Sequence, residues 1–465
     1  MPDFPTRKLE EIVDRVCVGY VGSCNNDYTE SGVGVPMVRT TNLTGTIVNY
    51  QDMKFISNDF HKKNIKSQLK KGDILVARHG DSGLPSIYES ENEANCLNVV
   101  IVKPSENENL IDNYYILYAL KSPFVVRQIK SAVGGSVQGV VNTKVIARLD
   151  IPYPERSIRV EIVKHIINLD RKIQLNRQTN QTLEQIAQAI FKSWFVDFDP
   201  VKAKIQAKQN GQDPELAAMC AISGLSTSNA ASVEEQLKGL DDVTLQQLKT
   251  TAALFPDALV ESELGEIPEG WKCSEIGKEV TVVGGGTPST KNNEYWEGGH
   301  IHWTTPRDMS NLTDKILLDT GRKITKAGLA KISSGLLPKN TVLMSSRAPV
   351  GYLAIAKVPV AINQGYIAMK CESDLTPEYV VQWAESVMDE IKQRASGTTF
   401  AEISKKNFRV IPVIVPDGNV IREFSKVVSK IYGKITEGIN ETKSLTKIRD
   451  TLLPKLLSGE MDLVG

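Results

Sequence analysis

The sequence predicts an α+β protein of two tandem α/β domains, each followed by a long α-helix, with the two helices paired as an antiparallel coiled coil. The first observation behind this prediction is an internal repeat, because residues 134–154 align with residues 396–416 at an offset of 262. The second is a seam of apolar residues, at steps of three and four, in the segment that follows each copy. The length of 465 residues suits two or three domains of roughly 100–200 residues each.

The repeat continues without a gap from the end of each domain into the helix behind it. At the same offset Gly135 aligns with Gly397 and Pro154 aligns with Pro416. Upstream, the copies correspond with small gaps and share a pattern of strand, turn-rich loop and strand. The chain is therefore a duplication, and it is expected to contain five segments: a first domain at 1–153, a central helix at 154–199, an acidic linker with short helices at 200–263, a second domain at 264–416 and a distal helix at 417–460.

The apolar seam of the long helices extends over roughly five heptads, which is typical of a coiled coil. Asn176 and Asn180 fall on the seam, where a polar residue costs stability and fixes the register. One helix precedes the second domain and the other follows it, so antiparallel pairing would hold the domains at opposite ends and act as a spacer. A helix that lies on its own domain is the alternative. The residues assigned to the seam are Ile162, Ile166, Leu169, Ile173, Asn176, Asn180, Leu183 and Ile190, followed by Phe424, Val428, Ile431, Ile435, Leu445 and Leu452.

The net charge of the chain is zero, with 55 basic and 55 acidic residues, which at first argues against a nucleic-acid binder. The charge is unevenly distributed, however. Residues 210–270 contain eleven acids and two lysines, a net charge of −9, so the rest of the chain carries +9. Two stretches at corresponding places of the repeat, 54–80 and 320–350, carry net charges of +5 and +6. This pairing favours contact with phosphates over an ordinary solvated surface.

The candidate DNA-binding residues lie in these basic stretches and at predicted strand ends. Arginine can bond guanine edges, while serine and threonine can bond phosphates or either base edge. Ordinary turn chemistry explains the residues at the strand ends about equally well. The candidates are Arg39, Thr40, Lys62, Lys63, Lys66, Arg78, His79 and Ser82 in the first domain, and Thr287, Ser289, Thr305, Arg307, Lys323, Lys326, Ser346 and Arg347 in the second.

No catalytic residue and no metal site are predicted. The glycine-rich segment 283–290 lacks the lysine of a phosphate-binding loop, and no Asn-Pro-Pro-aromatic or Asp-Pro-Pro-aromatic tetrapeptide of an amino methyltransferase occurs. Six cysteines without a C-x-x-C pair argue against a zinc site or a disulfide framework and fit a cytosolic compartment. No stretch approaches the roughly 18 apolar residues that cross a bilayer, so no membrane partner is expected.

Several segments resemble the specificity subunit of Type I restriction–modification systems. LGEIPEGW (264–271) resembles the entry to a target recognition domain, and GGGTPS (284–289) follows it at the expected distance. FKSWFVDFDPVKAK (191–204) is similar to the central region of that family, and LLPKLLSGEM (452–461) is similar to its closing segment. The first half departs from the pattern, because it opens at residues 3–12 without an I-P-x-G-W of its own.

The resemblance implies two target recognition domains that each read one half of a bipartite, asymmetric DNA site, on a coiled coil that sets the spacing and docks modification subunits. Its implied partners are double-stranded DNA, two modification (methyltransferase) subunits and two restriction (translocase and nuclease) subunits. S-adenosylmethionine, ATP and Mg²⁺ would be bound by these partners and none by this chain. The assembled complex would be an adenine-N6 DNA methyltransferase and ATP-dependent endonuclease. It would act in the bacterial or archaeal cytoplasm, on the nucleoid when bound to DNA.

Other function classes remain open from the sequence. One is a coiled-coil adaptor with protein partners only, and another is the specificity part of a different DNA methyltransferase system. A self-contained nuclease or methyltransferase is disfavoured by the missing catalytic motifs.

Overall fold

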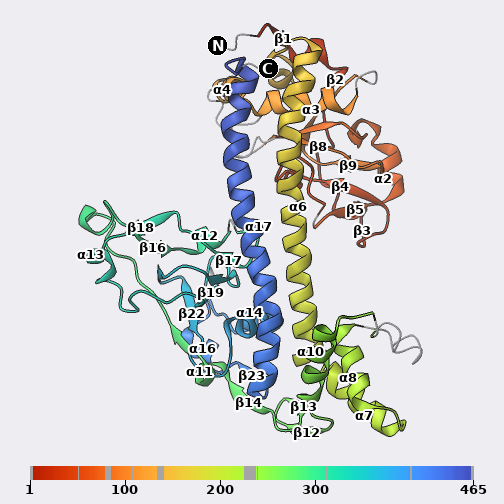
Figure 1. The fold of residues 1–465 in the computed structure, drawn as a ribbon. Coiled ribbons are helices and arrows are strands. Elements are labelled where there is room, and N and C mark those ends of the chain that lie inside the picture. Colours follow the sequence, from red (N-terminus) through yellow and green to blue (C-terminus); the bar gives the residue numbers. More distant parts are fainter. Residues whose placement is uncertain are drawn as a thin grey trace. The chain divides into compact units, whose positions relative to one another are not determined.

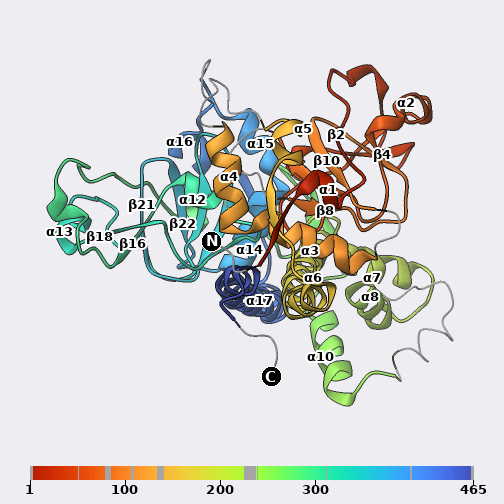
Figure 2. The same cartoon turned by 90° about the horizontal axis from the view of Figure 1, so that it is seen from above.

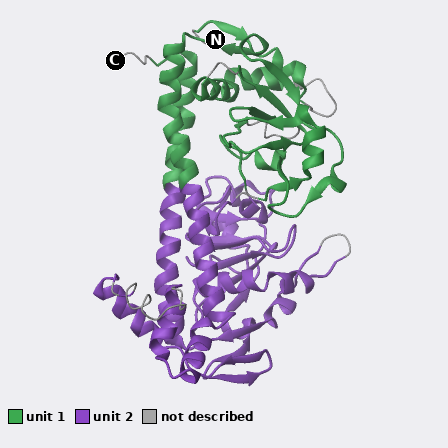
Figure 3. Ribbon diagram, turned by 90° about the vertical axis from the view of Figure 1, so that its right-hand side faces the viewer, with its two compact units in different colours: residues 1–175, 441–465 green, residues 176–440 purple. Residues whose placement is uncertain are grey.

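The computed structural model describes residues 4–50, 52–78, 85–105, 109–133, 141–224, 237, 239–310, 312–397 and 401–461. The chain divides into two compact units, unit 1 with residues 1–175 and 441–465, and unit 2 with residues 176–440 (Figure 1, Figure 3). Each unit mixes helices and strands, which confirms the predicted α+β class with two tandem domains and long helices. None of the described helices is long and apolar enough to cross a membrane.

Two long helices, α6 (Arg156–Phe195) and α17 (Gly418–Ser458), contribute to both units and lie side by side (Figure 1, Figure 2). Within unit 2, Asn180 of α6 bonds the carbonyl of Ile435, and the ring of Phe191 lies 6.0 Å from that of Phe424. Contacts that advance along α6 thus move backwards along α17. The helices are antiparallel, as predicted.

The residues assigned to the seam are all partly or fully removed from solvent. Asn180 donates from Nδ2 to the carbonyl of Ile435 at 3.2 Å, and a Cβ atom on Gly438 would lie only 2.5 Å from Oδ1 of Asn180. The glycine therefore allows the helices to approach closely at this point. The fully buried members are Ile162, Ile166, Ile173, Asn176, Asn180, Phe424, Val428 and Ile435, and the partly buried members are Leu169, Leu183, Ile190, Ile431, Leu445 and Leu452.

The first domain, in unit 1, contains a sheet of order β3-β5-β4-β9-β6 and a sheet of order β2-β10-β7-β8. Its first strand, β1, pairs with its last strand, β11. All strand pairs are antiparallel except β4 and β9. The strands are β1 (Thr6–Lys8), β2 (Arg15–Val18), β3 (Tyr28–Thr29), β4 (Val35–Val38), β5 (Lys54–Ile56), β6 (Gln68–Leu69), β7 (Ile74–Ala77), β8 (Ser86–Ile87), β9 (Ala94–Cys96), β10 (Val99–Lys103) and β11 (Asp150–Pro152).

Helix α3 is buried along almost its whole length, because its sequence LIDNYYILYALK is apolar on most sides. It belongs to one hydrophobic cluster with strands β7 and β10 and with residues of α6 and α17, so it joins the domain to the helix pair. The helices of this domain are α1 (Leu9–Ile12), α2 (Asn58–Lys63), α3 (Leu110–Lys121), α4 (Pro123–Val133) and α5 (Thr143–Ala147), with single 3-10 turns at η1 (Asn25–Asp27), η2 (Thr40–Asn42) and η3 (Ile65–Ser67).

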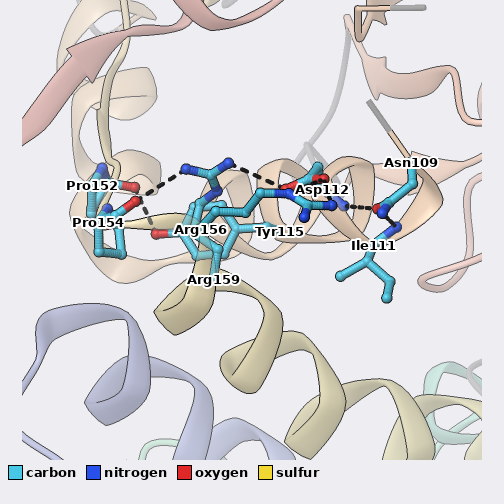
Figure 4. A network of polar contacts seen from close by, with 8 residues as sticks. All are labelled: Asn109, Ile111, Asp112, Tyr115, Pro152, Pro154, Arg156 and Arg159. Atoms are coloured by element: carbon cyan, nitrogen blue, oxygen red, sulfur yellow. Dashed lines mark hydrogen bonds and ion pairs between the residues drawn. The ribbon is translucent and has the colours of Figure 1, made fainter. Parts of the chain in front are cut away.

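A buried carboxylate bonds α3 to the first turns of α6 (Figure 4). Oδ2 of Asp112 accepts from Nε and Nη2 of Arg156 at 3.2 and 3.0 Å, and Oδ1 accepts from Nη2 of Arg159 at 3.2 Å. The guanidinium of Arg159 also lies over the ring of Tyr153, 4.0 Å from its centroid, and donates to the carbonyl of Pro154. Cation–π stacking and charge-assisted hydrogen bonds therefore act on the same buried group.

The second domain, in unit 2, has a sheet of order β15-β22-β19-β20-β17, a sheet of order β18-β16-β21 and the pairs β14-β23 and β12-β13. The strands are β12 (Leu259–Ser262), β13 (Gly265–Pro268), β14 (Lys272–Glu275), β15 (Thr281–Val283), β16 (Ile301–Thr304), β17 (Ile316–Leu317), β18 (Arg322–Ile324), β19 (Val342–Ser345), β20 (Leu353–Ala356), β21 (Val360–Ile362), β22 (Tyr366–Lys370) and β23 (Pro412–Val415). Its helices are α11 (Ile276–Glu279), α12 (Pro306–Ser310), α13 (Lys326–Leu329), α14 (Pro377–Ser386), α15 (Met388–Gln393) and α16 (Lys405–Arg409), with a 3-10 turn at η4 (Asn293–Tyr295).

The segment between the two domains carries helices α7 (Asp199–Gln209), α8 (Pro214–Ser223) and α10 (Asp242–Ala253), and α8 packs against both α7 and α10 (Figure 2). Ala218, Met219 and Ala252 belong to a small core of its own. The buried ammonium of Lys204 donates to Glu215 and to the carbonyl of Phe255, at 2.8 Å each. The segment is thus a packed helical element within unit 2.

Lys121 at the end of α3 gives unit 1 a pH-dependent stability. Burial lowers the pKa of Lys121 to about 8, although the nearby Asp170 carboxylate acts in the opposite direction. An unfolded lysine has a pKa of about 10.4, so the unfolded chain binds more protons at intermediate pH and the lysine's contribution to stability rises with pH. We expect the free energy of unfolding of the wild type to rise between about pH 7.5 and 9.5. This rise should exceed the change in the Lys121→Met variant over the same range by about 2 kcal/mol. Urea unfolding of both proteins measures this difference, and parallel pH profiles would contradict it.

Candidate nucleic-acid interface

In unit 1, the ends of three strands meet beside the turn at Asn98. β9 runs parallel to β4. The N–H of Leu97, the residue after β9, donates to the carbonyl of Val38, the last residue of β4. Arg39 follows β4 directly, and Arg78 follows β7 and donates from Nη1 to Oδ1 of Asn98 at 3.0 Å. Asn98 has a φ of 57°, a left-handed conformation that asparagine adopts more readily than most residues. We call Arg39, Thr40, Arg78 and Asn98 the strand-end site of unit 1.

Unit 2 repeats this arrangement with different side chains. The N–H of Asn363, after β21, donates to the carbonyl of Thr304 at the end of β16, with which β21 runs parallel. The N–H of Ser346, after β19, donates to the carbonyl of Gly365 at 2.8 Å, so β19 also ends here. The hydroxyl of Thr287 donates to Gln364 in the same turn at 2.6 Å. The strand-end site of unit 2 consists of Thr287, Thr305, Arg307, Ser346, Arg347 and Asn363.

An open pocket of about 530 Å³ lies at the strand-end site of unit 2, and Arg307, Arg347, Tyr352 and Asn363 are among its lining residues. Arg307 is exposed, and the side chain of Arg347 is 38% exposed with its Nη1 3.6 Å from the carboxylate of Glu402. Two accessible guanidinium groups beside an amide form a surface that can bond a phosphate or the edge of a purine.

The lysines predicted from the basic stretches lie elsewhere on the domains. β5 is antiparallel to β4, so α2, which carries the exposed Lys62 and Lys63, begins at the end of β4 that is away from Arg39. β18 is likewise antiparallel to β16, so α13 with the exposed Lys326 begins beside the first residue of β16. The structure therefore separates the arginines of the strand-end sites from these lysines in both units.

The remaining candidates have varied surroundings. Lys66 is exposed in η3, and Lys323 on β18 forms an ion pair of 3.5 Å with Asp319. Ser289 is exposed and accepts from the indole of Trp296 through its carbonyl. His79 and Ser82 lie outside the described residues.

No group of three or more histidine, cysteine, aspartate or glutamate side chains that could hold a metal ion occurs within the part of the chain that the structure describes. The six cysteines are all free thiols. Burial raises the pKa of Cys17 and, more strongly, that of Cys96, which disfavours the thiolate that a metal or an electrophile would require.

Comparison with known proteins identifies the family of this chain. The family described as the Type I restriction modification DNA specificity domain matches residues 3–185 and 268–443, one stretch for each domain with most of its long helix. The chain belongs to the family of Type I restriction–modification specificity subunits. The predicted family is thereby confirmed, and the two domains are called recognition domains from here on. Such subunits are non-catalytic and act with DNA and partner subunits.

Similar specificity subunits occur in bacteria and archaea. The Type I restriction enzyme HindI specificity subunit of Haemophilus influenzae is 31% identical over 414 residues, which cover 85% of this chain and 88% of the relative. The putative type I restriction enzyme MjaX specificity subunit of Methanocaldococcus jannaschii is 22% identical over 472 residues, 99% of this chain and 94% of the relative. A crystal structure of the S subunit of a Type I restriction–modification system from M. genitalium has 15% identity and a TM-score of 0.49, over 98% of this chain and 96% of its own.

Sequence reasoning named the arginines of the strand-end sites of this specificity subunit and missed their neighbours. Asn98 and Asn363 were not singled out, although each follows a short β segment. Each lies in a turn that leads from a strand paired in parallel (β9 or β21) to a strand paired antiparallel (β10 or β22). Glu402 was also missed, because it lies far from Arg347 in the chain and only the tertiary fold brings the two together. An asparagine within two residues of the end of the strand in both copies of the repeat was the available signal.

Proposed function

We propose that this specificity subunit reads a bipartite, asymmetric DNA site, with one strand-end site for each half. The observation that carries this proposal is the occurrence of one arrangement in both recognition domains with different side chains. In each, an arginine follows β7 or its counterpart β19 and lies beside an asparagine-bearing turn. Equivalent geometry explains why both domains bind DNA, and different side chains explain why the two half-sites differ.

The helix pair formed by α6 and α17 would set the distance between the half-sites and would dock the modification subunits. In the complete complex, two modification subunits would bind S-adenosylmethionine and methylate adenine at N6. Two restriction subunits would use ATP and Mg²⁺ to translocate and cleave DNA in the cytoplasm. This chain contributes the recognition surfaces, and no chemical step is assigned to its own residues.

Exchange of one recognition domain tests this proposal. Residues 1–153 are replaced by the corresponding region of a relative that recognises another sequence, and the hybrid is expressed with the modification subunit. Because each domain would read its own half-site, we expect one half of the methylated sequence to change while the other half and the spacer length stay the same. Single-molecule sequencing of adenine methylation in the cells gives both halves directly.

The reciprocal exchange of residues 264–416 is the matched control and should change the other half alone. A hybrid that changes both halves, or that changes neither while still methylating DNA, would contradict the division of reading between the two domains.

A further inference from the structure

Two carboxylates of α6, one in each unit, join a recognition domain to the helix pair. In unit 1 this group is Asp170, which is only 5% exposed. Its Oδ2 accepts from the hydroxyl of Thr46 at 2.8 Å, and its Oδ1 accepts from Nη1 of Arg449 at 2.7 Å. Thr46 in turn accepts from the ammonium of Lys121 at 2.9 Å. One buried carboxylate is thus bonded directly to the recognition domain and to α17, and through Thr46 to α3.

In unit 2 the corresponding group is Glu184. Its Oε1 accepts from the ammonium of Lys315 at 2.9 Å, from the amide of Gln382 at 3.0 Å and from the hydroxyl of Tyr432 at 3.4 Å. Lys315 belongs to the recognition domain, Gln382 to α14 and Tyr432 to α17. The side chains of Glu184 and Lys315 are each 17% exposed. Again one carboxylate of α6 contacts the domain, its long buried helix and the partner helix.

Thr46 and Lys315 occupy the same place in the two copies of the domain. Thr46 precedes Ile47, which forms a parallel bridge to Ile87 in β8, and Lys315 precedes β17, which pairs in parallel with β20. β8 and β20 are equivalent, since each pairs antiparallel with the preceding long strand, β7 or β19. A hydroxyl in one copy and an ammonium in the other therefore bond a carboxylate of the same helix from equivalent positions.

The short segment that carries Thr46 or Lys315 begins at the strand-end site of its own domain. Thr46 lies seven residues after Arg39, and Lys315 lies eight residues after Arg307. Hydrophobic contacts are non-directional and tolerate small rotations of one surface on another, whereas buried hydrogen bonds to a charged group depend strongly on geometry. A rotation of the recognition domain about the helix pair would break these bonds and move the arginines that follow β4 or β16.

We propose that Asp170 and Glu184 are positioning residues, which hold each recognition domain at one angle on the helix pair and so restrict the spacer length that the subunit accepts. This role rests on the proposed function and adds residues that do not touch DNA. Thr46 and Lys315 are their counterparts in the recognition domains. Loss of either bond leaves base readout in place and widens the range of accepted spacers.

The experiment uses the complete chain in complex with the modification subunit. Thr46→Val and Lys315→Met each remove one donor from the recognition domain, while Arg449 or Tyr432 still bonds the carboxylate. Methylation rates are measured on duplexes whose two half-sites are separated by the natural spacer, by one base pair fewer and by one base pair more. For each variant we expect the preference for the natural spacer to fall at least about tenfold, the effect of losing one hydrogen bond to a charged group.

Glu161→Gln is the matched control, because Glu161 lies on the same helix and its side chain, which is 43% exposed, forms an ion pair with Lys164 at the surface. Its spacer preference should equal that of the wild type. A purely structural role of Thr46 and Lys315 would slow methylation on all three duplexes equally and leave the preference unchanged, and that result would overturn the proposal. A wild type that shows no bipartite site would instead refute the proposed function, so the two failures are distinguishable.

Discussion

Replacement of Arg307 and Arg347 together by glutamate is expected to lower the methylation rate of the natural site by at least about 100-fold. Each guanidinium that contacts a base edge or a phosphate contributes about 1–3 kcal/mol, and the new carboxylates would repel the DNA backbone. Both side chains line the pocket at the strand-end site of unit 2 and neither is buried, so the double variant should fold. The measurement is the initial rate of adenine methylation on a duplex that carries both half-sites, with the modification subunit bound.

Lys249→Glu is the control for charge reversal, since Lys249 is exposed on α10 outside the recognition domains. It should leave the methylation rate within about twofold of the wild type, because a single distant charge is screened at physiological salt. An unchanged rate for the double arginine variant, in an assembled complex, would remove the strand-end site of unit 2 from DNA recognition.

Asp112→Ala is expected to lower the free energy of unfolding by about 3–5 kcal/mol, which is the effect of breaking a buried ion pair by removing one partner. Asp112 is 3% exposed and Arg159 is 7% exposed, so the substitution leaves a guanidinium buried without its carboxylate (Figure 4). The stacking of Arg159 on Tyr153 and its bond to Pro154 remain, but neither neutralises the charge. Urea unfolding of the complete chain measures the change.

Arg156→Gln provides the comparison for this ion-pair network. The side chain of Arg156 is 59% exposed, so water replaces its bond to Asp112 and the expected loss is below about 1 kcal/mol. If the two substitutions destabilised the chain equally, burial would not be the cause of the effect at Asp112.

The arrangement of domains and helices was predictable because it depends on patterns that are local in the sequence. Apolar residues at steps of three and four indicate burial along any helix, and the 262-residue repeat shows that the pattern occurs twice. Asp170 and Glu184 could not be identified in this way. An acidic residue within a helix is usually solvated, whereas Asp170 is buried and Glu184 is largely removed from solvent by residues that lie far from them in the chain.

The strand-end sites were predictable in part for a similar reason. Arg39 and Arg78 follow apolar β segments, so their position at strand ends could be inferred from composition. Their proximity depends on the parallel pairing of β4 with β9, which are separated by four other strands in the chain. Neither the partner nor the register of such a non-local pair can be derived from the two strands themselves. The lysines of α2 were grouped with Arg78 for lack of this information.

The core of unit 1 is made of residues that the ribosome adds at widely separated times. Its core combines Ile162 of α6 with Leu453, Leu456 and Leu457 of α17, which a ribosome adds only after it has made the 265 residues of unit 2 (residues 176–440). From residue 153, where the first recognition domain ends, to Leu453 the ribosome adds another 300 residues, which takes roughly 15–60 s at about 5–20 residues per second. Until then the apolar face around Ile162 is exposed to water or to a chaperone. The domain that is translated first is therefore the one that is completed last.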